Sequence, residues 1–272
     1  MYQGGDYIKM NIYEYISIDK DEKPLDRIVT DGGFCSIFRK IGCIGDSLAS
    51  GEFESIDKDG QKRYHDFFEY SWGQHIARSA GCKVYNFSRG GMTAKEYMET
   101  FALEKGYWDE DKLCEAYIIA LGVNEFIKGM EIGSIDDINR TDYRKNNKSF
   151  AGYYAQIIQK LKTMQPRAKF FLVSMPRFGD EGDIKRKKHR DLLESMTKYF
   201  DRTYLIDLFT YGPEYNEDFE NRFFLGHMTP TGYIVTARMI ESYIDYIIRK
   251  NPNDFAQAGF IGTDYYYDIE LG

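Results

Sequence analysis

Short apolar runs alternate with stretches of helix-type periodicity along most of the chain, and this alternation constrains the fold more than any other feature. It is typical of β-α-β units, in which helices connect neighbouring strands of a parallel sheet. The run at 116–121 is apolar at every position, as expected for a strand that is buried on both faces. The predicted strands are 37–44, 84–87, 116–121, 169–173 and 204–207.

The last predicted helix has the clearest pattern. Its apolar stripe repeats at intervals of 4, 3, 4 and 3 residues, through Tyr233, Ala237, Ile240, Ile244 and Ile247. Thr229 can cap this helix, and Pro230 fits its first turn, where a missing N–H costs nothing. His227 is therefore expected directly before a helix N-terminus. The other predicted helices lie at 67–80, from Thr93 onward, at 149–164 and at 184–200.

Three segments fit neither the strands nor the helices of this pattern. Residues 1–35 alternate apolar and polar positions and are predicted to form a small strand-rich N-terminal extension. Residues 125–148 are polar, and a loop of this length is often functional, so a lid is one interpretation. Residues 251–272 are predicted to pack as a tail on one central domain, residues 36–250.

The charge balance argues against nucleic acid as a partner. With 36 Lys and Arg against 43 Asp and Glu, the net charge is −7, whereas nucleic-acid binding needs a basic face. No apolar run approaches the roughly 18 residues of a membrane span. The first residues show neither the basic start nor the apolar stretch of a secretion signal, so we expect a cytoplasmic location. The cysteines match no paired metal spacing, and neither a metal nor an organic cofactor is indicated.

Small polar residues and glycines follow the predicted strands. In an open parallel sheet, ligands bind outside the carboxyl ends of the strands. Ser47 follows the first strand, Gly90 and Gly91 the second, Asn124 the third, and His227 precedes the last helix. A hydroxyl, backbone N–H groups, an amide and an imidazole are the parts of acyl transfer: a nucleophile, oxyanion donors and a general base.

In these blocks the chain resembles the SGNH, or GDSL-type, hydrolase family, over roughly residues 36–250. The resemblance implies a three-layer α/β/α sandwich with a five-stranded parallel sheet, of flavodoxin-like type. It also implies that Ser47 is the nucleophile and His227 the catalytic base. The backbone N–H groups of Ser47 and Gly91 and the side-chain amide of Asn124 would form the oxyanion hole.

One position departs from the family pattern. Family members commonly carry Asp three residues before the histidine, where it orients the imidazole, but this chain has Phe224 there. Three interpretations stay open. The backbone carbonyl of Phe224 could orient His227 in a Ser–His dyad, or a carboxylate such as Glu52, Asp207 or Glu125 could reach it. Alternatively, the site is impaired and the protein only binds.

The expected function is a serine esterase that hydrolyses a short acyl ester, with a carbohydrate O-acetyl group as one substrate. Aromatic residues make up 16% of the chain, which leaves room for a site lined by rings that stack on sugars. The alternative is a carbohydrate-binding or scaffolding protein on a hydrolase frame, and a homo-oligomer stays open. Of the other histidines, His65 and His75 are predicted at the surface or on a helix face. His189, within a run of basic residues, is predicted to be solvated.

Overall fold

The computed structural model describes residues 16 and 19–267, and its centre is a five-stranded parallel sheet with strand order β4-β1-β5-β6-β7. The strands are β1 (Lys40–Gly45), β4 (Lys83–Ser88), β5 (Ala116–Ala120), β6 (Lys169–Val173) and β7 (Thr203–Ile206). The predicted parallel sheet is confirmed. β1 begins three residues later than the apolar run suggests, because Gly33–Ile37 form the 3-10 turn η1.

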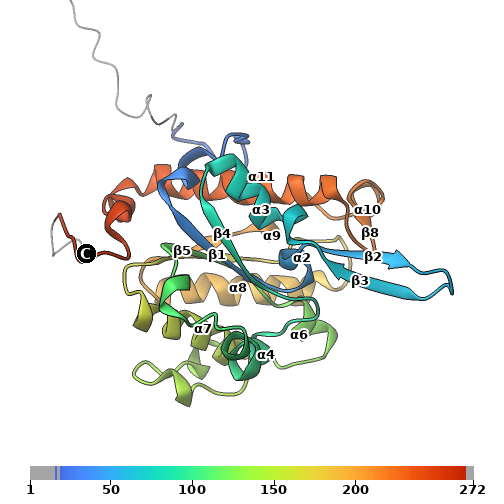
Figure 1. The fold of residues 1–272 in the computed structure, drawn as a ribbon, viewed down its shortest axis with the longest axis horizontal. Coiled ribbons are helices and arrows are strands. Elements are labelled where there is room, and N and C mark those ends of the chain that lie inside the picture. Colours follow the sequence, from blue (N-terminus) through green and yellow to red (C-terminus); the bar gives the residue numbers. More distant parts are fainter. Residues whose placement is uncertain (1–15, 17–18, 268–272) are drawn as a thin grey trace, which may run out of the picture.

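Helices cover both faces of the sheet and make three layers (Figure 1). One face packs against α3 (Trp72–Ala80) and α11 (Pro230–Lys250). The other packs against α7 (Phe150–Met164) and α8 (Asp183–Tyr199), together with the short helices that follow β4. Side chains of β5 alternate between the two cores, as the pleat of a strand requires. The prediction of a three-layer sandwich is therefore confirmed.

Several helix starts follow the side-chain caps that the sequence indicates. Thr229 accepts a hydrogen bond from the N–H of Gly232, and Pro230 is the first residue of α11. Ser149 caps α7 in the same way, and Thr93 forms a capping box with Glu96. The predicted helix at 67–80 begins later, at Trp72, because Phe68–Tyr70 form a separate 3-10 turn, η2.

Two small antiparallel pairs lie outside the central sheet, and the sequence analysis did not predict them. A hairpin of β2 (Glu52–Ile56) and β3 (Lys62–Asp66) follows the first turn of the sheet and extends outward from the body (Figure 1). A pair of β8 (Phe224–Leu225) and β9 (His227–Met228) turns at Gly226 and precedes α11. The remaining helices are α2 (Ser47–Ser50), α4 (Ala94–Glu96), π-helix η3 (Tyr97–Phe101), α5 (Ala102–Glu104), α6 (Val123–Ile127), α9 (Leu208–Tyr211) and α10 (Glu217–Phe223). The remaining 3-10 turns are η4 (Glu110–Lys112), η5 (Ile135–Asp137), η6 (Tyr143–Lys145), η7 (Pro252–Phe255) and η8 (Ala258–Phe260).

The peripheral segments differ in how they meet the body. The predicted strand-rich extension falls largely on residues 1–15 and 17–18, which lie outside the described part of the chain. Its described remainder forms turns and the start of η1, without a strand, so for these residues the prediction is wrong. The polar segment 125–148 packs along α7 and α8 through η5 and η6. Among the described residues, no helix is long and apolar enough to cross a membrane.

Candidate active site

Ser47 is the first residue of α2, directly after the carboxyl end of β1. The Asp46 side chain caps this helix by accepting a hydrogen bond from the N–H of Leu48, at 3.1 Å. Ser47 itself is half-buried and lies at the edge of the sheet, where β1 ends and α2 begins. This is the strand-to-helix turn that the sequence predicts for a nucleophile.

The amide of Asn124 links three turns at this edge. Its Nδ2 donates to the carbonyl of Met92 at 3.1 Å and lies 3.4 Å from Oδ2 of Asp46. Asp46 precedes Ser47, and Met92 follows Gly91. The structure therefore brings the turns of Ser47, Gly91 and Asn124 together at one edge of the sheet.

Gly91 has the backbone geometry of a residue that only glycine fills easily. Its φ is +69°, it is exposed, and a side chain there would meet nothing within 4 Å. A ligand can therefore approach its backbone without obstruction. Gly90, the preceding residue, is closed instead, because an added Cβ would overlap the Glu52 carboxylate.

Asp46 is almost completely buried, and burial raises its pKa to about 7. The hydrogen bond from the N–H of Leu48 acts in the opposite direction, and the nearby carboxylate of Glu125 acts in the same one. The carboxyl group that caps the Ser47 turn is thus one whose ionised form is disfavoured by burial.

His227 lies in β9 between two carboxylates of strand β2. Its Nε2 is 3.1 Å from Oε1 of Glu52, and its Nδ1 is 3.0 Å from Oε1 of Glu54. β9 packs against both α2 and β2, so the histidine stands beside the segment that carries Ser47. In the described part of the chain, no hydrogen bond joins His227 to Ser47, and no group of three or more His, Cys, Asp or Glu residues is arranged to hold a metal ion.

The predicted orientation of His227 by the Phe224 carbonyl is not what the structure shows. The Glu54 carboxylate contacts Nδ1 instead, because the β2–β3 hairpin follows directly after α2 and lies against β9. The Phe224 ring turns away and packs on Tyr215 and Phe219.

Of the three carboxylates considered from the sequence, only Glu52 contacts His227, and it does so at Nε2. Asp207 caps α9 and pairs with Arg190, at 2.8 Å. Glu125 is buried and accepts a hydrogen bond from the N–H of Ala94. Sequence reasoning missed Glu54. The available signal was the Asp59-Gly60 pair, typical of a hairpin turn, with alternating residues before it.

The two glutamates point toward His227 because alternate residues of a strand share one face. Phe53, between them, points the other way and packs on the ring of Tyr233 in α11, whose hydroxyl donates to the Glu52 carbonyl at 2.8 Å. The environments of the glutamates differ. Burial raises the pKa of Glu52, whereas a hydrogen bond from Lys62 lowers the pKa of Glu54.

His189 is fully buried, so the prediction of a solvated histidine in a basic run is wrong. It lies on the inner face of α8 with Leu192, Leu193 and Met196. Its Nε2 is 3.0 Å from the carbonyl of Leu121, at the turn that leads to Asn124. Burial lowers its pKa to about 4, so the ring is neutral near pH 7.

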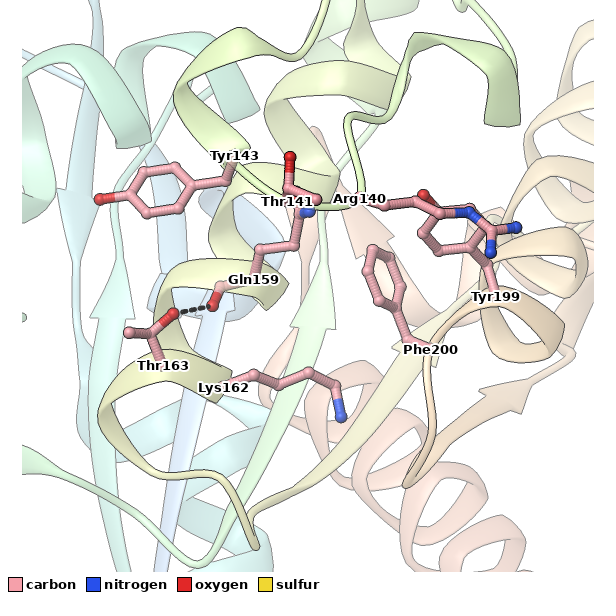
Figure 2. A pocket seen from close by; sticks show the side chains of 8 residues that line it. All are labelled: Arg140, Thr141, Tyr143, Gln159, Lys162, Thr163, Tyr199 and Phe200. Carbon is pink, nitrogen blue, oxygen red and sulfur yellow. Dashed lines mark hydrogen bonds between the residues drawn. The ribbon is translucent and has the colours of Figure 1, made fainter.

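Figure 2 shows a separate pocket of about 390 Å³, which none of these residues lines. It is formed by the carboxyl-terminal parts of α7 and α8 and by the loop before η6, at the edge where β6 and β7 begin. Its lining includes Arg140, Lys162 and Tyr199. Because Ser47 and Asn124 follow the carboxyl ends of their strands, this pocket is at the opposite edge of the sheet and is not part of the candidate site.

The sequence model of the GDSL-like Lipase/Acylhydrolase family matches residues 43–235, which include Ser47, Gly91, Asn124 and His227. The chain belongs to this family. The GDSL-like assignment agrees with the order of the blocks along the chain and with their convergence at one edge of the sheet. No curated protein sequence matches the chain.

Solved structures share the GDSL-like fold at low sequence identity. A family two carbohydrate esterase from Clostridium thermocellum, in complex with cellohexaose, has a TM-score of 0.55 at 18% identity, covering 77% of this chain and 64% of that one. A carbohydrate esterase family 2 enzyme with a carbohydrate binding domain, from Corynascus thermopiles, has a TM-score of 0.52 at 15% identity, with 77% and 66% covered. A protein from Lactobacillus plantarum has a TM-score of 0.57 at 16% identity, with 77% and 97% covered. This chain thus spans just under two thirds of the two carbohydrate esterase chains.

Proposed function

We propose that this GDSL-like hydrolase is a serine esterase in which Ser47 is the nucleophile and His227 the general base. The observation that carries the proposal is the convergence at the carboxyl edge of the sheet. Hydrogen bonds of Asn124 join the turns of Ser47 and Gly91, and β9 brings His227 against α2. These are the groups that acyl transfer requires, and no cofactor is needed for that chemistry.

In the proposed reaction, Ser47 Oγ attacks the ester carbonyl carbon while Nε2 of His227 takes the hydroxyl proton. The N–H groups of Ser47 and Gly91 and the amide of Asn124 hold the resulting oxyanion. Cleavage of the C–O bond releases the alcohol, which takes the proton from Nε2. Water then attacks the acyl-serine by the same route and releases the carboxylic acid.

The carboxylate of Glu52 must leave Nε2 before this sequence can begin. Nε2 is the nitrogen that has to accept the serine proton, and Glu52 is its partner in the structure. Because burial raises the pKa of Glu52, its charged form is disfavoured beside the site. A side-chain rotation of Glu52 away from His227 would free the base for Ser47.

We propose a carbohydrate O-acetyl ester as the substrate class. Aromatic side chains of the hairpin region are partly exposed, namely Tyr64, Phe67 and Tyr70. The Tyr64 ring stands nearly perpendicular to His227, with ring centroids 5.9 Å apart. The exposed Tyr64 ring beside His227 suits the stacking of a pyranose face, whereas Phe67 and Tyr70 pack on Phe53, on the other face of β2. The carbohydrate esterases among the solved structures of this fold support the same choice.

The test is hydrolysis of a short acyl nitrophenyl ester by wild type and Ser47→Ala. We expect kcat to fall on the order of 10⁶-fold, as when a serine nucleophile is removed. Ser195→Ala, at an exposed position of α8, is the matched control and should behave as wild type. Near-normal turnover by Ser47→Ala would remove the proposal. A panel of acetylated glycans and of acyl esters of graded length then tests the substrate class.

A second candidate function is carbohydrate binding without hydrolysis. The contact of Glu52 with Nε2 favours it, because a base held in this way does not activate a nucleophile. A fluorophosphonate probe distinguishes the two functions. Covalent labelling of Ser47 supports the esterase, whereas an unlabelled protein that binds acetylated glycans supports the binder.

A further inference from the structure

We propose that Glu54 is the positioning residue for His227, supplied by the inserted hairpin in place of the carboxylate that position 224 lacks. This inference rests on the proposed function and assigns its third residue. In a serine triad, a carboxylate at Nδ1 keeps the imidazole in the tautomer whose Nε2 can accept a proton. Phe224 offers no such side chain, and Glu54 lies at this nitrogen, 3.0 Å away.

The turn of β8 and β9 is shaped to admit the Glu54 carboxylate. Gly226, directly before His227, has a φ of +75°. An added Cβ at Gly226 would overlap the Glu54 carboxyl group. The glycine therefore serves both the turn and the close approach of the glutamate to the imidazole.

Glu54 is held on both sides of its carboxylate. Its Oε1 meets Nδ1 of His227, and its Oε2 accepts a hydrogen bond from Lys62 in β3 at 3.0 Å. The hairpin that carries it is anchored to α11 through Phe53 and Tyr233. A carboxylate fixed in this way can orient the imidazole at little further cost in side-chain entropy.

The assignment selects Glu54 over Glu52 because the two carboxylates contact different nitrogens. Glu52 lies at Nε2, which the reaction needs for Ser47, so Glu52 cannot orient the base during catalysis. Glu54 lies at Nδ1, which the reaction leaves free. Movement of Glu52 away from Nε2 would leave that nitrogen free, with Glu54 still at Nδ1.

The activity test compares three variants of the full chain in the nitrophenyl ester assay. Glu54→Gln should lower kcat by roughly 10²- to 10⁴-fold with little change in KM, the upper value being that of a triad whose carboxylate becomes an amide. Lys62→Met breaks the same Glu54–Lys62 pair but leaves the carboxylate at His227, and should lower kcat less than about tenfold. Asp59→Asn, an exposed residue at the tip of the hairpin, should match wild type. Equal losses in Glu54→Gln and Lys62→Met would show a structural role and overturn the proposal, as would wild-type turnover by Glu54→Gln.

A second measurement does not depend on activity. Nitrogen-15 NMR of the His227 ring at about pH 8 reports which nitrogen carries the proton. We expect it on Nδ1 in wild type and shifted toward Nε2 in Glu54→Ala, which has no acceptor there. An unchanged tautomer overturns the role of Glu54 even if Ser47→Ala confirms an esterase. A shifted tautomer supports it even if the protein does not hydrolyse esters.

Discussion

Acidification should lower the free energy of unfolding through His189, because burial lowers the pKa of this histidine. The ring is fully buried on α8, and both of its nitrogens have backbone neighbours. Nε2 lies 3.0 Å from the Leu121 carbonyl, and Nδ1 lies 3.5 Å from the N–H of Met175. The neutral tautomer with its proton on Nε2 satisfies both contacts. A second proton on Nδ1 would face the Met175 N–H and remain buried without an acceptor.

The sign and the magnitude follow from linkage. The pKa of His189 falls from 6.5 to about 4 on folding, so between these values the unfolded chain binds a proton that the folded protein excludes. The contribution is complete above pH 6.5 and is lost as the pH falls toward 4. At about 1.4 kcal/mol for each pKa unit, the total is roughly 3 kcal/mol, of which about 2 kcal/mol is lost by pH 5.

The assay is urea unfolding of wild type and His189→Gln at several pH values between 7.5 and 4.5. Glutamine does not titrate and can still donate to the Leu121 carbonyl. Other groups also titrate, such as Asp46 and Glu241, whose raised pKa values make stability fall as the pH rises. Their contributions cancel when the stability of the variant is subtracted from that of wild type. We expect wild type to lose about 2 kcal/mol relative to His189→Gln between pH 7 and pH 5. A difference that does not change with pH would refute the reasoning.

Three further predictions concern the candidate site and its helix. Asn124→Ala should lower kcat by ~10²–10³-fold in the ester assay, the usual effect of losing one oxyanion donor, and an unchanged kcat would remove Asn124 from the oxyanion hole. Gly226→Ala should lower both turnover and the melting temperature, because its Cβ would overlap Glu54 and its φ is positive; wild-type behaviour in calorimetry and kinetics would contradict the close approach. Thr229→Ala should reduce the free energy of unfolding by about 1 kcal/mol, since it removes the cap of α11, and urea titration checks this.

The central sheet could be predicted because its middle strands, β5 and β6, are apolar and buried along most of their length. Strand β5 is buried from Ala116 to Ile119, as expected for an apolar run in the middle of a parallel sheet. The starts of α7 and α11 could be predicted because Ser149 and Thr229 satisfy backbone N–H groups that would otherwise lack partners. These signals are local, so a sequence carries them without knowledge of the rest of the fold.

His189 shows how a local reading fails. The run of basic residues around it indicates a solvated surface, and most of that run is solvated. The helical period was nevertheless present, because Leu192, Leu193 and Met196 follow His189 at three, four and seven residues and lie on the same buried face. The burial of His189 therefore follows the helical period of its apolar neighbours and not the basic composition of the segment.

Glu54 could not be found by comparing the chain with the family pattern, because that pattern looks for the orienting carboxylate three residues before the histidine. The imidazole, however, requires only a negatively charged acceptor at Nδ1, from whichever segment the fold brings there. Here that segment is a hairpin that begins five residues after Ser47 and packs against β9, the strand that contains His227. In the proposed triad the carboxylate comes from β2, and no carboxylate is needed at position 224, where Phe224 packs with Tyr215 and Phe219. Phe224 and Gly226 both fit this arrangement: the Phe224 side chain packs away from the imidazole, and Gly226 leaves the space that the Glu54 carboxylate occupies.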